Sequence, residues 1–219
     1  PAIFTPTDGT VLEDATFQSA TYVTDSTQVP VGELGPPCFT PGTVIETETG
    51  PRLIETLAPG DRVLTRDRGM QPVLWIGRRT MPGTGAFAPV RFAAGAIGNP
   101  DPLTVSPQHR MLVTGWRAEL YFGEAEVLVA ARHLVNGNTI RQVERAEVTY
   151  IHLLFAAHEI VMAGGVPSES FFLGHALRAC DADTRAELLA LFPDLAPGAR
   201  DLVPARQVAR RFEGAVLAA

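Results

Sequence analysis

Between residues 43 and 162, short apolar runs alternate with turn-forming residues, which predicts many short β-strands rather than long helices. The first run, 43–47, alternates in polarity, and the Glu48-Thr49-Gly50 segment after it suits a hairpin turn. The other expected strands are 52–57, 62–65, 73–76, 90–92, 103–105, 110–113, 127–129, 148–155 and 159–162. About ten strands at this spacing predict a curved or closed, mostly β architecture. Residues 123–132 fit a helix as well as a strand, because their periodicity does not separate the two.

The pattern changes on both sides of this region. Residues 1–37 are polar and end in a stretch rich in Pro and Gly, so we expect a loosely structured lead-in or the end of an upstream partner. Residues 173–219 are expected to be helical. Asp181 or Asp183 can cap a helix that runs through Phe192, and a second helix can start at Pro204. We therefore expect a lead-in at 1–37, a β domain at 38–172 and a short helical C-terminal extension at 173–219.

Composition narrows the classes of function. The chain has 219 residues, of which 46% are apolar, enough for a sizeable core, and its 20 Gly and 18 Pro fit the many expected turns. A net charge of −6 with scattered Lys and Arg argues against binding to nucleic acid. No run approaches the roughly 20 apolar residues of a membrane-spanning helix, and the N-terminus lacks the features of a secretory signal. The compartment stays open between the cytoplasm and secretion as part of a larger protein.

Two cysteines are present, Cys38 and Cys180. Cys38 lies in the segment PPCFTPGT at 36–43, where an irregular entry leads directly into the first expected strand. On this context alone, a buried and unreactive thiol is the more common fate of such a residue. A disulfide between the two cysteines would remove any nucleophile at Cys38.

Four polar residues accompany Cys38: one serine and three histidines. Ser106 and His109 lie on a turn between two expected strands, in the segment VSPQH at 105–109, where a hydroxyl and an imidazole can hold a backbone amide and deliver a proton to its nitrogen. His152 and His158 flank the bend of an expected β-hairpin. No Cys or carboxylate completes a metal ligand set with them, so neither a metal nor another cofactor is expected. Taken singly, each histidine fits a structural role equally well.

Taken together and in this order, these segments resemble the Hint domain, the hedgehog/intein autoprocessing module, and its bacterial members more than the eukaryotic hedgehog proteins. CFTPGTVIET from Cys38 resembles the family's opening, and LAPGDRVL at 57–64 resembles its second turn. VSPQH resembles its Thr-x-x-His block, with Ser106 in the place of Thr, and 150–166 resembles its closing hairpin. The resemblance covers 38–172. It implies a horseshoe-like, mostly β Hint fold that brings Cys38 beside His109.

The resemblance also implies a self-processing reaction on the chain's own backbone. Cys38 would attack the carbonyl of Pro37 and convert the Pro37–Cys38 peptide to a thioester by an N–S acyl shift. Water or another small or protein nucleophile would then release the N-terminal segment. His109 would protonate the departing nitrogen, with Ser106 as its hydrogen-bonding aide. His152 falls near a position where family members often place an acid–base residue.

Two features depart from the family. Full splicing needs an Asn at the C-terminal junction, but all the Asn residues here precede the closing hairpin: Asn99, Asn136 and Asn138. Full splicing is therefore not expected, and His158, which in splicing members would assist that step, loses its clearest role. Pro37 is the second departure, because a prolyl carbonyl is crowded and thioester formation there should be slow.

Two other classes of function stay open. One is a catalytically degenerate Hint scaffold that serves as a binding or tethering module of a larger secreted protein. Pro37 and the absent Asn favour it. The other is a cysteine hydrolase that acts on foreign substrates through Cys38 and a histidine, although no separate substrate domain is visible. The presence of Ser106, His109 and His152 favours self-processing.

Overall fold

Short strands make up most of the computed structural model, which describes residues 37–171 and 203–209. Buried and exposed side chains alternate along strands such as β1 (Val44–Thr47) and β3 (Arg62–Thr65), because successive side chains of a strand point to opposite faces. The described residues hold one α-helix, α1 (Trp116–Phe122). The prediction of a mostly β fold with many short strands is confirmed.

The larger sheet has nine strands. Eight follow the order β14-β9-β8-β13-β12-β1-β3-β4, and β2 pairs with β1 as the hairpin expected around Glu48 and Thr49. A 3₁₀ turn, η2 (Ile54–Thr56), replaces the second half of the strand expected at 52–57. The bounds of the other strands are β2 Gly50–Leu53, β4 Gly69–Pro72, β8 Arg110–Thr114, β9 Glu126–Ala130, β12 Ile160–Ala163, β13 Val166–Glu169 and β14 Gln207–Val208.

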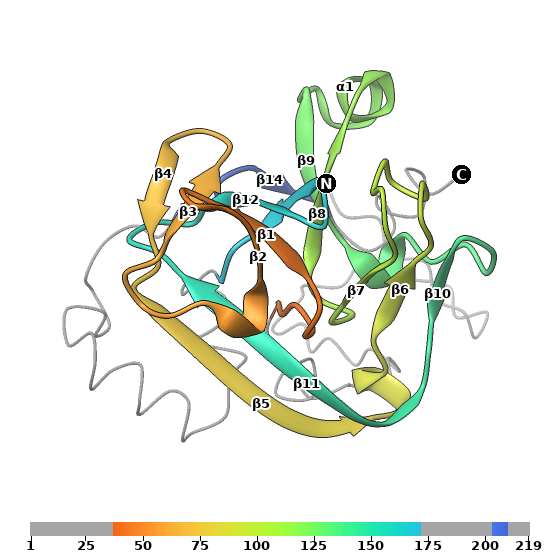
Figure 1. Ribbon diagram of the computed structural model, residues 1–219. Helices are drawn as coiled ribbons and strands as arrows, with labels where there is room; N and C mark the ends of the chain where they lie inside the picture. Colours follow the sequence, from red (N-terminus) through yellow and green to blue (C-terminus); the bar gives the residue numbers. More distant parts are fainter. Residues whose placement is uncertain (1–36, 172–202, 210–219) are drawn as a thin grey trace, which may run out of the picture.

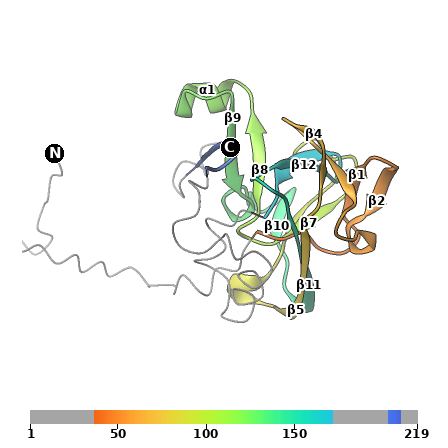
Figure 2. The ribbon, with the colours of Figure 1, turned by 90° about the vertical axis from the view of Figure 1, so that its left-hand side faces the viewer.

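Two smaller groups of strands complete the fold. β5 (Trp75–Gly83) and β11 (Arg145–Leu154) form a long antiparallel ribbon, which Figure 1 shows along the lower side of the molecule. β10 (Ile140–Gln142), β6 (Val90–Phe92) and β7 (Leu103–Val105) pair in that order. The 3₁₀ turns η3 (Gly85–Phe87) and η4 (Ala131–His133) lie in the connections. Figure 2 shows α1 at the end of the β8–β9 pair, away from β5 and β11.

Phe39 joins two of these units. It forms an antiparallel bridge to Val105 of β7 and another to Ile151 of β11, with two backbone hydrogen bonds of 2.9 Å to Ile151. Its side chain is buried in the main apolar core. The chain entering the domain is therefore fixed between β7 and β11, and the residue before Phe39 has no freedom to leave this position without breaking both bridges.

One expectation about a connection is wrong. The hairpin expected between 148–155 and 159–162 does not form, because β11 takes β5 as its partner and β12 pairs with β13, β1 and β3 in the other sheet. The actual hairpin is β12–β13, whose turn, Gly164-Gly165, has positive φ at both residues, as a tight two-residue turn requires. Of the two alternatives left open for 123–132, the strand forms, as β9 at residues 126–130. The helix α1 lies just before them and was not expected.

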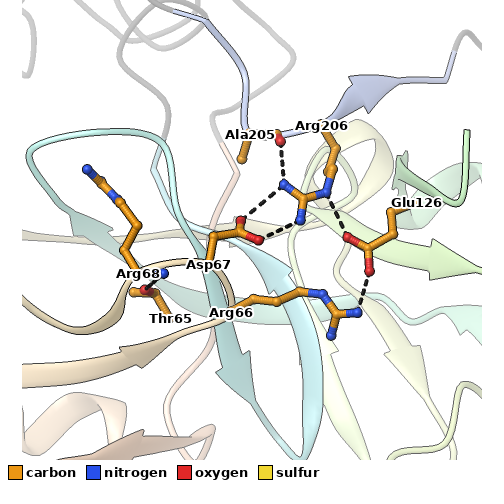
Figure 3. A network of polar contacts seen from close by, with 7 residues as sticks. All are labelled: Thr65, Arg66, Asp67, Arg68, Glu126, Ala205 and Arg206. Carbon is orange, nitrogen blue, oxygen red and sulfur yellow. Dashed lines mark hydrogen bonds and ion pairs between the residues drawn. The ribbon is translucent and has the colours of Figure 1, made fainter.

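The second helix expected to start at Pro204 is also wrong within the described residues. There, residues 207–208 form β14, which extends the larger sheet by parallel pairing with β9, and Ala209 donates a hydrogen bond to the Leu128 carbonyl (2.9 Å). Arg206 anchors this strand through two bonds to Asp67 (2.6 and 3.0 Å) and one to Glu126 (2.7 Å), as Figure 3 shows. The pairing of β14 with β9 and the ion pairs of Arg206 hold these residues as a strand, where a helix was expected. The helix expected through Phe192 lies outside the described residues.

Candidate active site

The position of Cys38 follows from the register of Phe39. In antiparallel pairing, the residue before Phe39 lies opposite the residues after Val105 and Ile151, which are Ser106 and His152. The main-chain bond from the Ser106 N–H to the Cys38 carbonyl (2.9 Å) continues this pairing. The backbone geometry of one residue therefore brings together three of the side chains expected to carry chemistry.

Ser106 binds the amide nitrogen of Cys38. The Cys38 N–H donates to Ser106 Oγ at 3.0 Å, and both residues are buried. The turn that carries Ser106 is itself fixed, because the His109 N–H donates to the Ser106 carbonyl (3.1 Å) and the Arg132 N–H donates to the Pro107 carbonyl (3.0 Å). Ser106 thus holds the nitrogen of the peptide that precedes Cys38.

His152 contacts the carbonyl oxygen of that peptide and the thiol of Cys38. Its Nδ1 lies 2.9 Å from the Pro37 carbonyl oxygen, and its Nε2 lies 3.4 Å from Cys38 Sγ. Because a carbonyl oxygen only accepts hydrogen bonds, Nδ1 carries the hydrogen. In a neutral ring, Nε2 then has a free lone pair and accepts the S–H of Cys38. One imidazole therefore faces both a thiol and the carbonyl that this thiol would attack.

Both partners are neutral at rest. Burial raises the pKa of the Cys38 thiol well above its usual value, although the Ser106 hydroxyl acts in the opposite direction. Burial lowers the pKa of His152 to about 4, which the bond to the Pro37 carbonyl only partly opposes. Near neutral pH, the thiol is therefore not ionised and the imidazole is not protonated.

His109 lies in the same region but makes no such contact. Its ring packs on Phe39, with ring centroids 4.3 Å apart, and neither ring nitrogen has a hydrogen-bond partner among the described residues. Burial lowers its pKa to about 4, although Glu169 acts in the opposite direction. His109 makes no hydrogen bond to the Cys38 nitrogen that it is expected to protonate. The Ser106 hydroxyl takes that place.

His158 lies in a buried ion-pair cluster. Its Nε2 is 3.3 Å from Glu169 Oε2, and its Nδ1 accepts the Ala205 N–H at 3.0 Å. Glu169 also accepts bonds from the Arg110 backbone N–H (2.8 Å) and guanidinium (2.9 Å). Burial alone would raise the pKa of Glu169, but Arg110 and His158 outweigh it and lower that pKa. His152 and His158 thus serve different sites, and no group of three potential metal ligands occurs in the described part of the chain.

Sequence reasoning missed the aromatic surroundings of His152. Its ring stacks parallel to that of Trp75, at 6.3 Å between centroids and 13° between planes, and meets the edge of Phe171 at 4.9 Å. A Trp inside a compact apolar run signalled only a core residue. Glu169 was missed as well, and an acidic residue between two serines at the end of the β12–β13 hairpin was the available signal.

Comparisons with known proteins give one family match and several similar structures. A family model described as the Hint domain matches residues 37–175. A bacterial intein-like domain from Clostridium thermocellum is 14% identical, with 61% of this chain and 97% of that chain covered and a TM-score of 0.39. The corresponding values are 17%, 59%, 98% and 0.42 for the MchDnaB-1 intein, and 11%, 61%, 98% and 0.39 for a DnaB intein from Synechocystis.

A search of curated proteins finds no match. Within the described residues, none of the helices has the length and apolar character needed to span a membrane.

Proposed function

Because this chain belongs to the Hint domain family, we propose that it is a self-processing domain that cleaves its own backbone between Pro37 and Cys38. The observation that carries the proposal is the double contact of His152, whose two ring nitrogens face the Cys38 thiol and the Pro37 carbonyl. A buried histidine with a purely structural role has no need to bridge a nucleophile and its electrophile. The reaction class is an N–S acyl shift followed by transfer of the acyl group.

The first step is attack on the Pro37 carbonyl. Cys38 Sγ forms a bond to the carbonyl carbon while its proton passes to Nε2 of His152, and the carbonyl oxygen becomes an oxyanion. The 3.4 Å separation of Sγ and Nε2 suits this transfer, since sulfur bonds are longer than those of oxygen. His152 acts as the general base.

The same imidazole stabilises the oxyanion. Its Nδ1–H already donates to the Pro37 oxygen at 2.9 Å. Once Nε2 has taken the thiol proton, the ring is cationic, and a hydrogen bond from a charged donor to an anion is about twice as strong as a neutral one. Proton removal and oxyanion binding are therefore coupled in one side chain, and the stabilisation rises as the negative charge develops.

The second step is departure of the Cys38 nitrogen. The bond between the Pro37 carbonyl carbon and this nitrogen breaks, and the nitrogen takes up a proton to become an amine. The proton held by His152 balances this step, so the shift needs no external acid. Ser106 holds the nitrogen through its hydroxyl, which can both accept and donate, and favours the amine over the amide. His109 stays a predicted acid, and it would have to be protonated and reach the nitrogen.

The thioester is then resolved by water or by another nucleophile of small or protein type, which releases the segment before Cys38. Full splicing is not proposed, because no Asn follows the β12–β13 hairpin. His158, the residue that would assist such a step, instead binds Glu169. The substrate is therefore the chain's own N-terminal flank.

Intact-mass spectrometry of the full chain tests this proposal. Wild type incubated with dithiothreitol or hydroxylamine should lose the residues before Cys38, and Cys38→Ala should keep its full mass. Cys180→Ala is the matched control, since it removes the other thiol and should cleave like wild type. A wild-type mass unchanged after prolonged incubation would contradict the proposal.

The second candidate is a catalytically degenerate Hint scaffold that binds or tethers. The buried, un-ionised thiol and the crowded prolyl carbonyl favour it. The variant Pro37→Gly separates the two candidates, because it relieves the crowding without touching the machinery. Cleavage of Pro37→Gly alone would identify a competent site with a blocked substrate, whereas no cleavage of either form would identify the inert scaffold.

A further inference from the structure

Gly77 occupies a special position on the ribbon of β5 and β11. It is the direct cross-strand partner of His152 in the antiparallel register. A Cβ at this position would lie 2.1, 2.7 and 2.8 Å from three atoms of the six-membered ring of Trp75, closer than real Cβ atoms approach. The indole therefore fills the space that any other residue at position 77 would need, and only glycine allows it to lie there.

The indole reaches this space because Trp75 and Gly77 are two residues apart on one strand and so share a face. Lying over Gly77, the ring comes to rest parallel to the imidazole of His152. Phe171 closes the arrangement, with its ring 4.9 Å from His152 and 5.8 Å from Trp75. All three aromatic residues are less than a tenth exposed. The imidazole is thus held between two apolar walls that also exclude water.

We propose that Trp75, seated over Gly77, is a positioning residue that fixes the ring of His152 so that Nδ1 faces the Pro37 carbonyl and Nε2 faces the Cys38 thiol. This inference rests on the proposed function of His152. A rotation of the imidazole by half a turn about its Cβ–Cγ bond would place carbon atoms where both nitrogens now lie. The parallel indole and the edge of Phe171 define the plane of the ring and oppose intermediate orientations.

The inference predicts a specific pattern among variants. Trp75→Leu keeps an apolar side chain but loses the stack, and Gly77→Ala drives a methyl group into the indole, so each should slow cleavage by on the order of tenfold. Trp75→Phe keeps an aromatic wall and should stay close to wild type. Leu74→Ala is the matched control, since Leu74 directly precedes β5 and is 41% exposed, and this variant should leave the rate unchanged.

Two measurements on the full chain test the inference. The first is the single-turnover rate of thiol-induced cleavage at Pro37–Cys38, followed by intact mass. The second is nitrogen-15 NMR of the His152 ring in a Cys38→Ala background, which cannot cleave. The shifts of the two nitrogens report the tautomer directly, and a pH titration reports the pKa. The ionisable groups that face this ring are His109 and, outside this background, the Cys38 thiol.

The expected result is a single Nδ1–H tautomer with a pKa of about 4 with Trp75 and Gly77 present. In Trp75→Leu and Gly77→Ala we expect a mixture of tautomers and a pKa that moves towards 6.5, because water reaches the ring. A loss of packing alone would leave the tautomer unchanged.

The outcomes separate this inference from the proposed function. An unchanged tautomer and pKa in both variants would overturn the inference, even if wild type cleaves. If wild type does not cleave, the proposed function fails, and the NMR measurement still decides whether Trp75 orients His152. Should Gly77→Ala fail to fold, Trp75→Leu and Trp75→Phe carry the test.

Discussion

Two buried, neutral histidines should make the domain lose stability as the pH falls from about 6.5 to about 4. His109 and His152 each have a pKa of about 4 in the folded chain, with burial as the main cause. In the unfolded chain, both return to the usual value of 6.5. Between these values the unfolded chain binds protons that the folded chain does not, so acid favours unfolding.

The direction and the magnitude of the change in stability follow from the difference between the folded and unfolded pKa values. A depressed pKa contributes stability that is fully present above pH 6.5 and is lost as the pH falls towards 4. The difference between the two values corresponds to about 3 kcal/mol for each histidine. Where both titrate, the free energy of unfolding should fall by up to about 2.7 kcal/mol per pH unit. This is a large share of the roughly 5–15 kcal/mol that stabilises a typical domain.

The assay is denaturant unfolding at a series of pH values from 7.5 to roughly 4.5, in a Cys38→Ala background that prevents cleavage. The variants His109→Gln and His152→Gln should each remove about half of the slope, whatever they do to the stability at neutral pH. The reasoning is refuted if the wild-type free energy of unfolding stays flat between pH 6.5 and 5. It is also refuted if the double variant keeps the full slope.

Three further changes have defined outcomes. Ser106→Ala leaves the buried N–H of Cys38 without its acceptor and should slow cleavage by about tenfold in the mass assay, whereas Ser106→Thr should cleave at close to the wild-type rate. Arg206→Ala breaks the ion pairs that anchor β14 and should lower the free energy of unfolding by about 1 kcal/mol; no loss at low salt would contradict the anchoring role. Gly165→Ala should cost about 1–3 kcal/mol in thermal or denaturant unfolding, because φ is +78° and the new Cβ would lie 2.6 Å from a proline ring. Gly137→Ala, with φ of +72° but open space, should cost less, and equal losses would mean that the close contact is relieved by other shifts.

Much of the strand pattern could be predicted from the sequence. The strands at 62–65, 90–92 and 103–105 form with the expected bounds. Alternation shows which residues face the core, but it carries no information about the partner strand. The expected hairpin after β11 therefore failed, since eight cross-strand pairs to β5 replace it. The strand at 207–208 was missed for the same reason, because its pairing and its ion pairs join residues far apart in sequence.

The sequence predicted which residues form the candidate site, but not how their side chains are arranged. The motifs around Cys38 and Ser106 indicated that these residues meet, and the register of Phe39 brings them together. The contacts of His152 with the Cys38 thiol and the Pro37 carbonyl could not be predicted from the sequence. They depend on the orientation of the imidazole ring, which tertiary packing against Trp75 determines. The place of His158 next to Glu169 depends on pairing within the larger sheet, where Ile160 of β12 lies opposite Glu169 of β13.

The two bridges of Phe39 also bear on how completely the proposed reaction would run. They hold the part of the chain that follows the scissile bond, so Cys38 would stay in its place as the new first residue of a folded domain. On the other side, the hydrogen bond between His152 and the Pro37 carbonyl holds the N-terminal segment, and hydrolysis would turn this carbonyl into a carboxylate. Before cleavage, the reacting groups share one molecule and meet at a very high effective molarity. After it, re-ligation would need a bimolecular encounter, so dilution would make the cleavage a one-way event.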